Sequence, residues 1–145
     1  MLRALLLAAL LVTGMAAARA EDTPKATLYK SPQCGCCEGY ADYLRGNGFD
    51  ITVVPTHDLA SISRKAGVPS NLEGCHTMLV DGYVVDGHVP LNIVRRVLSQ
   101  RPPIKGVTLP GMPAGSPGMG GDKTEPFVVY ALPKDGGPPF VYAKE

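Results

Sequence analysis

Three cysteines within four residues, Cys34, Cys36 and Cys37, constrain this chain more than any other feature, and a fourth, Cys75, follows later. Four cysteines in a small exported protein commonly form a disulfide framework. This spacing is poor for that purpose. A bridge between the neighbours Cys36 and Cys37 needs an unfavourable ring, and every bridge within the triplet closes a tiny loop that removes little entropy from the unfolded chain. The spacing therefore favours thiolate chemistry over structural cross-links.

The residues around the triplet strengthen this interpretation. A strand expected over 26–30 is broken at Pro32, and apolar residues recur at helical spacing from 38 to 47. The cysteines then lie at a helix N-terminus, where free amides and the helix dipole favour thiolate over thiol. Clustered thiolates select Cu(I), zinc or an iron–sulfur centre. Three ligands so closely spaced fit a multinuclear cluster with bridging sulfurs better than one tetrahedral zinc.

The order of expected elements predicts an α/β fold. A crossover helix between the first two strands requires parallel pairing, and Asp81-Gly82 between β-rich runs predicts an antiparallel hairpin with a type I′ turn. We expect a thioredoxin-like mixed sheet flanked by helices, in which the segment of Cys75 passes beside the triplet. The elements are strand 26–30, helix 38–47, strand 49–54, a helix capped by Thr56, strands 78–80 and 83–85, and a helix starting at Pro90.

Both ends differ from this core, which we place at residues 21–101. Residues 1–20 combine Arg3, an apolar run over 4–12 and small residues before Glu21, as a cleaved signal peptide does. This predicts a periplasmic protein without a membrane span after cleavage. Residues 102–145 begin with a Pro/Gly-rich loop that cannot be a helix, followed by strands near 127–132 and 140–142, so we expect a C-terminal loop and β-hairpin packed on the core.

The charge balance excludes one class of partner. Loss of Arg3 and Arg19 with the signal peptide lowers the count of Lys and Arg from 14 to 12 against 13 Asp and Glu, a net charge of about −1 (12 − 13). The longest basic run is only Arg95-Arg96. Nucleic-acid binding needs a basic patch, so we expect no nucleic-acid partner.

Several motifs together resemble the CopG-type copper-resistance family, a periplasmic family with a thioredoxin-like core. They are Ser31-Pro32-Gln33-Cys34-Gly35-Cys36-Cys37, Gly74-Cys75-His76-Thr77, Asp81-Gly82-Tyr83, Gly87-His88-Val89-Pro90 and Pro110-Gly111-Met112-Pro113-Ala114-Gly115-Ser116-Pro117-Gly118-Met119. The resemblance spans nearly all of the chain after the signal peptide. It implies copper binding by Cys34, Cys36, Cys37 and Cys75 in a thiolate-bridged multinuclear Cu(I) cluster, and a role in interconverting Cu(I) and Cu(II).

Further donors are candidates for ligands or supporting residues. His76 could ligate copper, or its positively charged form could stabilise a neighbouring thiolate. If His76 begins a strand, however, alternation would turn its side chain away from that of Cys75. His88 either caps the last core helix or contacts the site, and His57 is expected at the surface. Met112 and Met119 carry soft thioethers that suit Cu(I), or they fill an apolar gap over the site.

Three functions remain open from the sequence. The first is copper binding with redox capability, in which Cys34 and Cys37 supply two electrons by forming a disulfide. The second is a thiol–disulfide oxidoreductase with the same two residues as attacking and resolving thiols. The third is a module stapled by two disulfides. A periplasmic efflux system or a thiol reductant would be the protein partner of the first.

Overall fold

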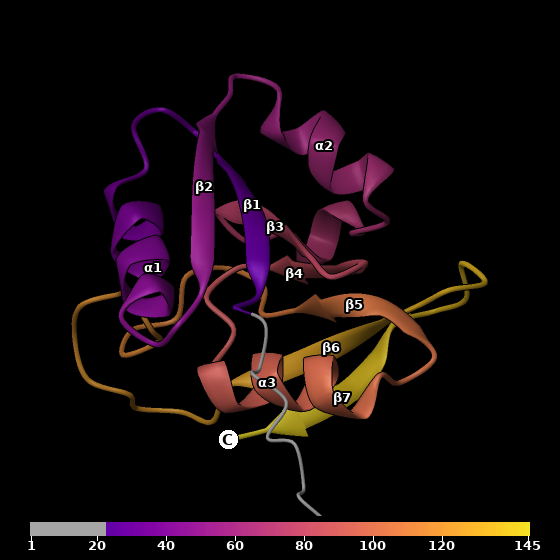
Figure 1. Ribbon diagram of the computed structural model, residues 1–145. Coiled ribbons are helices and arrows are strands. Elements are labelled where there is room, and N and C mark those ends of the chain that lie inside the picture. The colour runs from indigo at the N-terminus through magenta and orange to yellow at the C-terminus, as the bar shows by residue number, and fades with distance from the viewer. Residues whose placement is uncertain (1–22) are drawn as a thin grey trace, which may run out of the picture.

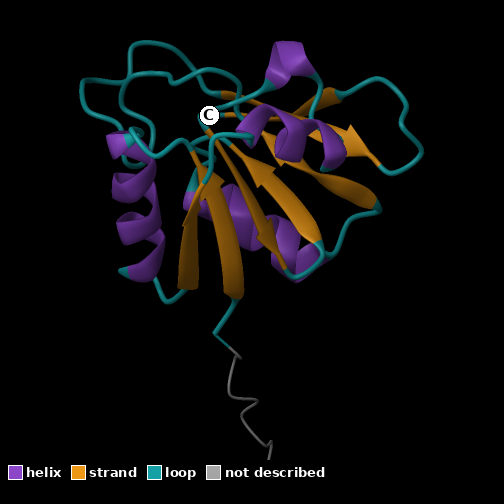
Figure 2. Cartoon of the chain, turned by 90° about the horizontal axis from the view of Figure 1, so that it is seen from above, coloured by secondary structure: helices purple, strands orange, loops and turns teal. Residues whose placement is uncertain are grey.

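The computed structural model describes residues 23–145 as one mixed sheet with helices on both faces (Figures 1 and 2). The expected signal peptide, 1–20, lies outside the described residues. No helix within 23–145 combines the length and apolar character that crossing a membrane requires.

The elements are β1 (Lys25–Lys30), α1 (Gly35–Arg45), β2 (Asp50–Pro55), α2 (Leu59–Lys65), a 3-10 turn (Ser70–Leu72), β3 (His76–Val80), β4 (Tyr83–Asp86), α3 (Leu91–Gln100), β5 (Ile104–Thr108), β6 (Val128–Pro133) and β7 (Phe140–Lys144).

The sheet has seven strands in the order β2-β1-β3-β4-β5-β6-β7. Two neighbouring pairs are parallel, β1 with β2 and β4 with β5, and each is joined by a helix, α1 or α3. The other pairs are antiparallel. The expected mixed α/β sheet with a C-terminal loop and β-hairpin is confirmed, and the hairpin of β6 and β7 continues the main sheet.

The turn between β3 and β4 brings two functional segments together. Asp81 and Gly82 have φ angles of 49° and 81°, as a type I′ turn requires, so the expected hairpin is confirmed. Thr77 pairs with Asp86 near the open end of this hairpin. The residues just before β3 and just after β4 therefore leave the sheet side by side, and these segments carry Cys75 and His88.

Alternate strand residues build the main core on the face covered by α1 and α3. Leu28 and Met78 are fully buried there against Tyr40 of α1 and Ile93 of α3. Each such side chain contributes roughly 1.5–3 kcal/mol of hydrophobic stabilisation. The Tyr40 hydroxyl donates a hydrogen bond to the Val89 carbonyl at 2.8 Å, which ties α1 to the segment entering α3.

The opposite face of the sheet carries α2, which begins later than the sequence predicted. Thr56 is not its N-cap, because the helix starts at Leu59 after Asp58. The Thr56 hydroxyl oxygen instead accepts the Asp58 amide within the preceding turn, at 3.1 Å. Ser63 of α2 lies 2.7 Å from the hydroxyl of Thr77, so this helix is joined to β3 by a buried polar contact.

Residues 109–127 between β5 and β6, here called the cover loop, dock against α1 (the orange segment in Figure 1). Gly118 has a φ of +79°, and a Cβ there would lie 2.4 Å from the Tyr40 amide nitrogen. Only glycine allows this approach of two backbones. Ser116 and Phe127 are buried at 2 % and 7 % exposure, so the cover loop is a packed part of the fold.

Candidate metal centre

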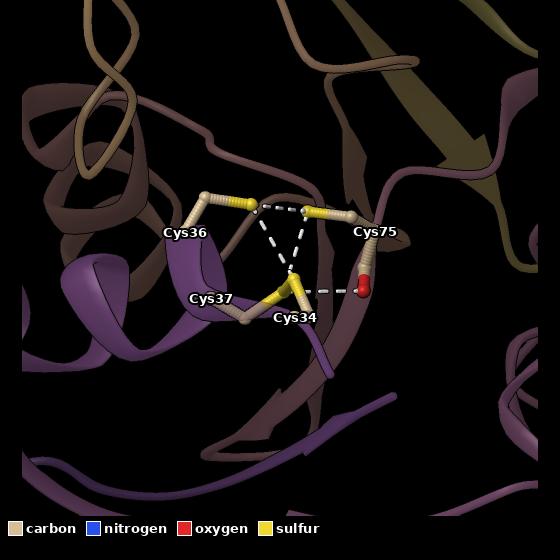
Figure 3. Close-up of side chains that lie close together, drawn as sticks. All are labelled: Cys34, Cys36, Cys37 and Cys75. Carbon is tan, nitrogen blue, oxygen red and sulfur yellow. Dashed lines mark hydrogen bonds between the residues drawn. A yellow bond between two sulfur atoms is a disulfide. The ribbon is translucent and has the colours of Figure 1, made fainter. Parts of the chain in front are cut away.

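The site forms where β1 ends and α1 begins. Cys34 is the N-cap residue of α1, and Cys36 and Cys37 lie in its first turn, as expected from the sequence. Cys34 and Cys37 form a disulfide, while Cys36 and Cys75 are free thiols. Figure 3 shows the four side chains pointing toward one another from two distant parts of the chain.

The separations between the sulfurs suit shared coordination. Cys36 Sγ lies 3.3 Å from Cys34 Sγ and 3.9 Å from Cys75 Sγ, and Cys37 Sγ lies 3.4 Å from Cys75 Sγ. Two metal–sulfur bonds of about 2.3 Å that meet at about 120° span about 4 Å. The four donor atoms all lie within 4.8 Å of one another. The donor set is therefore compact enough for sulfurs to bridge metal ions.

His88 extends this cluster with a nitrogen donor. Its Nδ1 lies 2.6 Å from the Pro117 carbonyl, which can only accept, so Nδ1 carries the proton. The lone pair of Nε2 then faces Cys75 Sγ at 2.9 Å. Burial lowers the pKa of His88 and keeps the ring neutral. Metal-binding histidines are commonly oriented in this way, by a hydrogen bond from the second ring nitrogen to a backbone carbonyl. The His88 side chain therefore contacts the cysteine cluster and does not cap α3.

His76 also belongs to the cluster, against the alternation argument. Because β3 starts at His76, Cys75 is outside the strand, and His76 Nδ1 lies 3.6 Å from Cys75 Sγ. Burial, reinforced by His88, lowers the pKa of His76 to about 3. The ring is therefore neutral at pH 7 and does not stabilise a thiolate as a cation. Its Nδ1 is the nitrogen that faces Cys75, while its Nε2 is buried without a hydrogen-bond partner within residues 23–145.

The thiol of Cys75 is protonated in the metal-free protein. Burial, with the neighbouring Cys36 as a smaller cause, raises the pKa of Cys75 to about 12. A metal ion bound at Cys75 would have to displace that proton, which would pass to the solvent. The second donor group of the site consists of Cys37, Cys75, His76 and His88, and Cys75 therefore links the sulfur-rich half to the nitrogen-rich half.

Asp86 holds the Cys75 segment in place, a role that sequence reasoning missed. Its buried carboxylate accepts the Gly74 amide at 2.5 Å and the Thr77 hydroxyl at 2.7 Å. Gly74 also packs directly on Gly87, because a Cβ added to Gly74 would lie 2.4 Å from the Gly87 Cα. The available signal was an aspartate ending the apolar run Val84-Val85, where a buried carboxylate needs nearby donors.

Lys30 was also missed. It is only 2 % exposed, and its ammonium donates to the carbonyls of Ser31 and Cys34, each at 3.2 Å. Glu38 lies 3.2 Å from the same ammonium. Lys30 therefore fixes the turn that carries Cys34 while its charge is balanced by the first turn of α1.

The two methionines of the cover loop differ in whether their side chains contact the cysteines. Met112 Sδ lies 4.0 Å from Cys36 Sγ, and Met112 is 55 % exposed. Met119 contributes its backbone amide to the loop, donating to the Ser116 carbonyl at 2.9 Å, and no hydrogen bond joins its side chain to the cysteines in the described part of the chain. His57 is exposed, as expected.

The chain is similar to one family model and to two solved structures. The family model described as "Protein of unknown function, DUF411" matches residues 72–119, which include Cys75, His88 and Met112 but not the cysteine triplet. Two solved structures of a copper resistance protein copG are similar along nearly their whole length. Form 2 is 33 % identical with a TM-score of 0.79, covering 86 % of this chain and 99 % of that one. Form 1 is 34 % identical with a TM-score of 0.76, covering 83 % and 96 %. No curated protein matches.

Proposed function

Because this chain belongs to the CopG family of copper resistance proteins, we propose that it binds Cu(I) as its cargo through Cys34, Cys36, Cys37 and Cys75. The observation that carries this proposal is the convergence of four sulfurs from two distant segments within 4.8 Å. A domain that is only held together by two disulfides would not need all four sulfurs to lie at one place. Binding in the periplasm, with an efflux system or a thiol reductant as partner, belongs to the same proposal.

The donor chemistry favours Cu(I) over zinc. Thiolates and thioethers are soft ligands that suit Cu(I), and the close sulfur separations favour several ions that share bridging sulfurs. A structural zinc site would instead use four ligands around one ion. His88 and His76 add nitrogen donors beside Cys75, and imidazole also suits copper. The proposed cargo is therefore a multinuclear Cu(I) cluster once Cys34 and Cys37 are reduced.

The disulfide supports a redox role for the same residues. When the Cys34 and Cys37 thiols meet two Cu(II) ions, each sulfur gives up one electron. The products are one S–S bond, two Cu(I) ions and two protons. The free thiols of Cys36 and Cys75 remain to hold Cu(I) in the oxidised protein. A thiol reductant would have to return two electrons and two protons to restore the dithiol.

Anaerobic titration of Cu(I) into the fully reduced protein tests the binding proposal, with zinc titrated in parallel. We expect more than one copper per chain, and fewer in Cys36→Ser and Cys75→Ser. Met78→Leu is the control, because Met78 is a buried core residue and the swap conserves volume. No copper above background in the wild-type protein would refute the proposal.

A thiol–disulfide oxidoreductase is the second candidate, because the Cys34–Cys37 disulfide sits at a helix N-terminus. The free thiols of Cys36 and Cys75 and the thioether of Met112 crowd the face where a substrate disulfide would dock. Insulin reduction by the metal-free protein separates the two functions. Fast insulin reduction by the metal-free wild-type protein would favour the oxidoreductase. Insulin reduction no faster than that of a Cys34→Ser variant would favour copper binding.

A further inference from the structure

Three sulfur donors and one imidazole nitrogen follow one another at short distances from the solvent to the interior. Met112 Sδ is followed by Cys36 Sγ at 4.0 Å, Cys75 Sγ at a further 3.9 Å and His88 Nε2 at a further 2.9 Å. Exposure falls in the same order, from 55 % at Met112 through half-buried Cys36 and Cys75 to 0 % at His88. Each step is short enough for one metal ion to contact both donors.

The position of Met112 is set by its neighbours. The Gly111 amide donates to the Glu73 carbonyl at 3.3 Å, just before the Cys75 segment. On the other side, the Pro113 carbonyl accepts the Ser116 hydroxyl at 2.7 Å and its amide at 3.2 Å. The first bond ties the segment to the chain just before Cys75, and the other two close a turn within the cover loop beside the buried Ser116. The contact of Met112 with Cys36 is therefore part of the docked loop.

Filling an apolar gap does not explain Met112. A gap-filling methionine is buried, whereas more than half of this side chain faces solvent. A thioether is a soft, neutral donor with no proton to displace, so it takes up Cu(I) without a preceding ionisation. Cys36, the next donor, is a free thiol while Cys34 and Cys37 are bridged. The outer pair is thus available in both redox states of the disulfide.

We propose that Met112 and Cys36 form an entry site for Cu(I) at the outer edge of the cluster, from which the ion passes inward to Cys75 and His88, and that Met112 is not a ligand of the filled cluster. This inference rests on the proposed copper-binding function and adds the route of uptake. Transfer is a ligand exchange without a change in oxidation state. Met112 binds the incoming ion, and Cys36 loses its proton to the solvent as its thiolate replaces the previous carrier. Cys75 then loses its own proton to the solvent and binds the ion, and Met112 dissociates.

Stopped-flow transfer from a coloured Cu(I) bicinchoninate complex to the reduced protein tests the entry site. The variant is Met112→Leu, which keeps the size of the exposed side chain and removes the sulfur. The matched control is Met119→Leu, in the same loop. We expect Met112→Leu to slow transfer by about tenfold, the effect of losing one contact in a transition state. The final copper count should equal that of the wild-type protein, and Met119→Leu should transfer at the wild-type rate.

X-ray absorption at the selenium edge gives a second readout. In selenomethionine-labelled, disulfide-bonded Cys75→Ser protein with one equivalent of Cu(I), the ion cannot pass on to Cys75 and stays at the entry site. We expect selenium–copper scattering in this background when Met119 is replaced by leucine, and none when Met112 is replaced by leucine. Equal transfer rates in Met112→Leu and wild type would overturn the entry site while leaving copper binding intact. A lower final copper count in Met112→Leu would also overturn it, because Met112 would then belong to the final cluster. Absence of copper binding in the wild-type protein would instead refute the proposed function itself.

Discussion

Replacing Gly118 with alanine tests whether the cover loop is docked on α1 beside His88. The new Cβ would lie 2.4 Å from the Tyr40 amide nitrogen and 2.7 Å from the Tyr40 Cα. These are backbone atoms in the middle of α1, which is packed into the core through Tyr40 and Leu44. The helix cannot retreat, so the loop must move. That movement pulls the Pro117 carbonyl away from His88 Nδ1.

The expected loss of stability follows from two contributions. An alanine held at a φ of +79° costs about 1–2 kcal/mol relative to glycine. Losing the buried hydrogen bond between His88 and Pro117 costs about 1 kcal/mol. The free energy of unfolding should therefore fall by about 2–3 kcal/mol, which lowers the urea midpoint by about 1–2 M for a chain of this size.

Urea unfolding of the metal-free protein measures this difference, and Gly120→Ala is the matched control. Gly120 lies in the same loop, and a Cβ there would meet no atom within 4 Å, so its effect should stay within about 0.5 kcal/mol. We also expect Gly118→Ala, unlike Gly120→Ala, to be cleaved by proteases within residues 109–127. Equal stability of the two variants would refute the docked-loop reasoning.

Three further predictions concern the same framework. Tyr40→Phe leaves the buried Val89 carbonyl without its donor, so the free energy of unfolding should fall by about 1–3 kcal/mol, and an unchanged urea midpoint would contradict the contact. Asp86→Asn turns an amide group toward the Gly74 and Thr77 donors. It should lower the melting temperature and weaken Cu(I) binding, whereas a melting temperature at or above wild type would show that the carboxylate does not hold the Cys75 segment. Cu(I) at 100 times its dissociation constant should raise stability by about 2.7 kcal/mol in a thermal melt, and chelation should reverse the gain; a melting temperature unaffected by copper would argue against binding to the folded state.

The arrangement of the sheet could be predicted because its signals are local. Asp81-Gly82 between two β-rich runs determines the hairpin, and that hairpin places Cys75 and His88 at one end of the sheet. The cysteine triplet at the start of α1 was predicted from the break at Pro32 and the helical spacing that follows it. These features depend on neighbouring residues, which sequence patterns report well.

The contacts that cross between segments could not be predicted in the same way. The orientation of His88 depends on the Pro117 carbonyl, a backbone group in a distant loop. The position of His76 was misjudged because alternation applies only within a strand, and β3 begins one residue after Cys75. Lys30 and Asp86 are charged residues whose burial depends on partners from other elements.

X-ray absorption at the copper edge would detect a shared thiolate cluster by its ligands and by its copper–copper distances. The sample is the fully reduced protein loaded anaerobically with Cu(I) to saturation. We expect a first shell dominated by sulfur at about 2.3 Å, together with copper–copper scattering from sulfur-bridged ions. A first shell of nitrogen and oxygen, or a single copper without a copper neighbour, would contradict a shared thiolate cluster of Cys34, Cys36, Cys37 and Cys75.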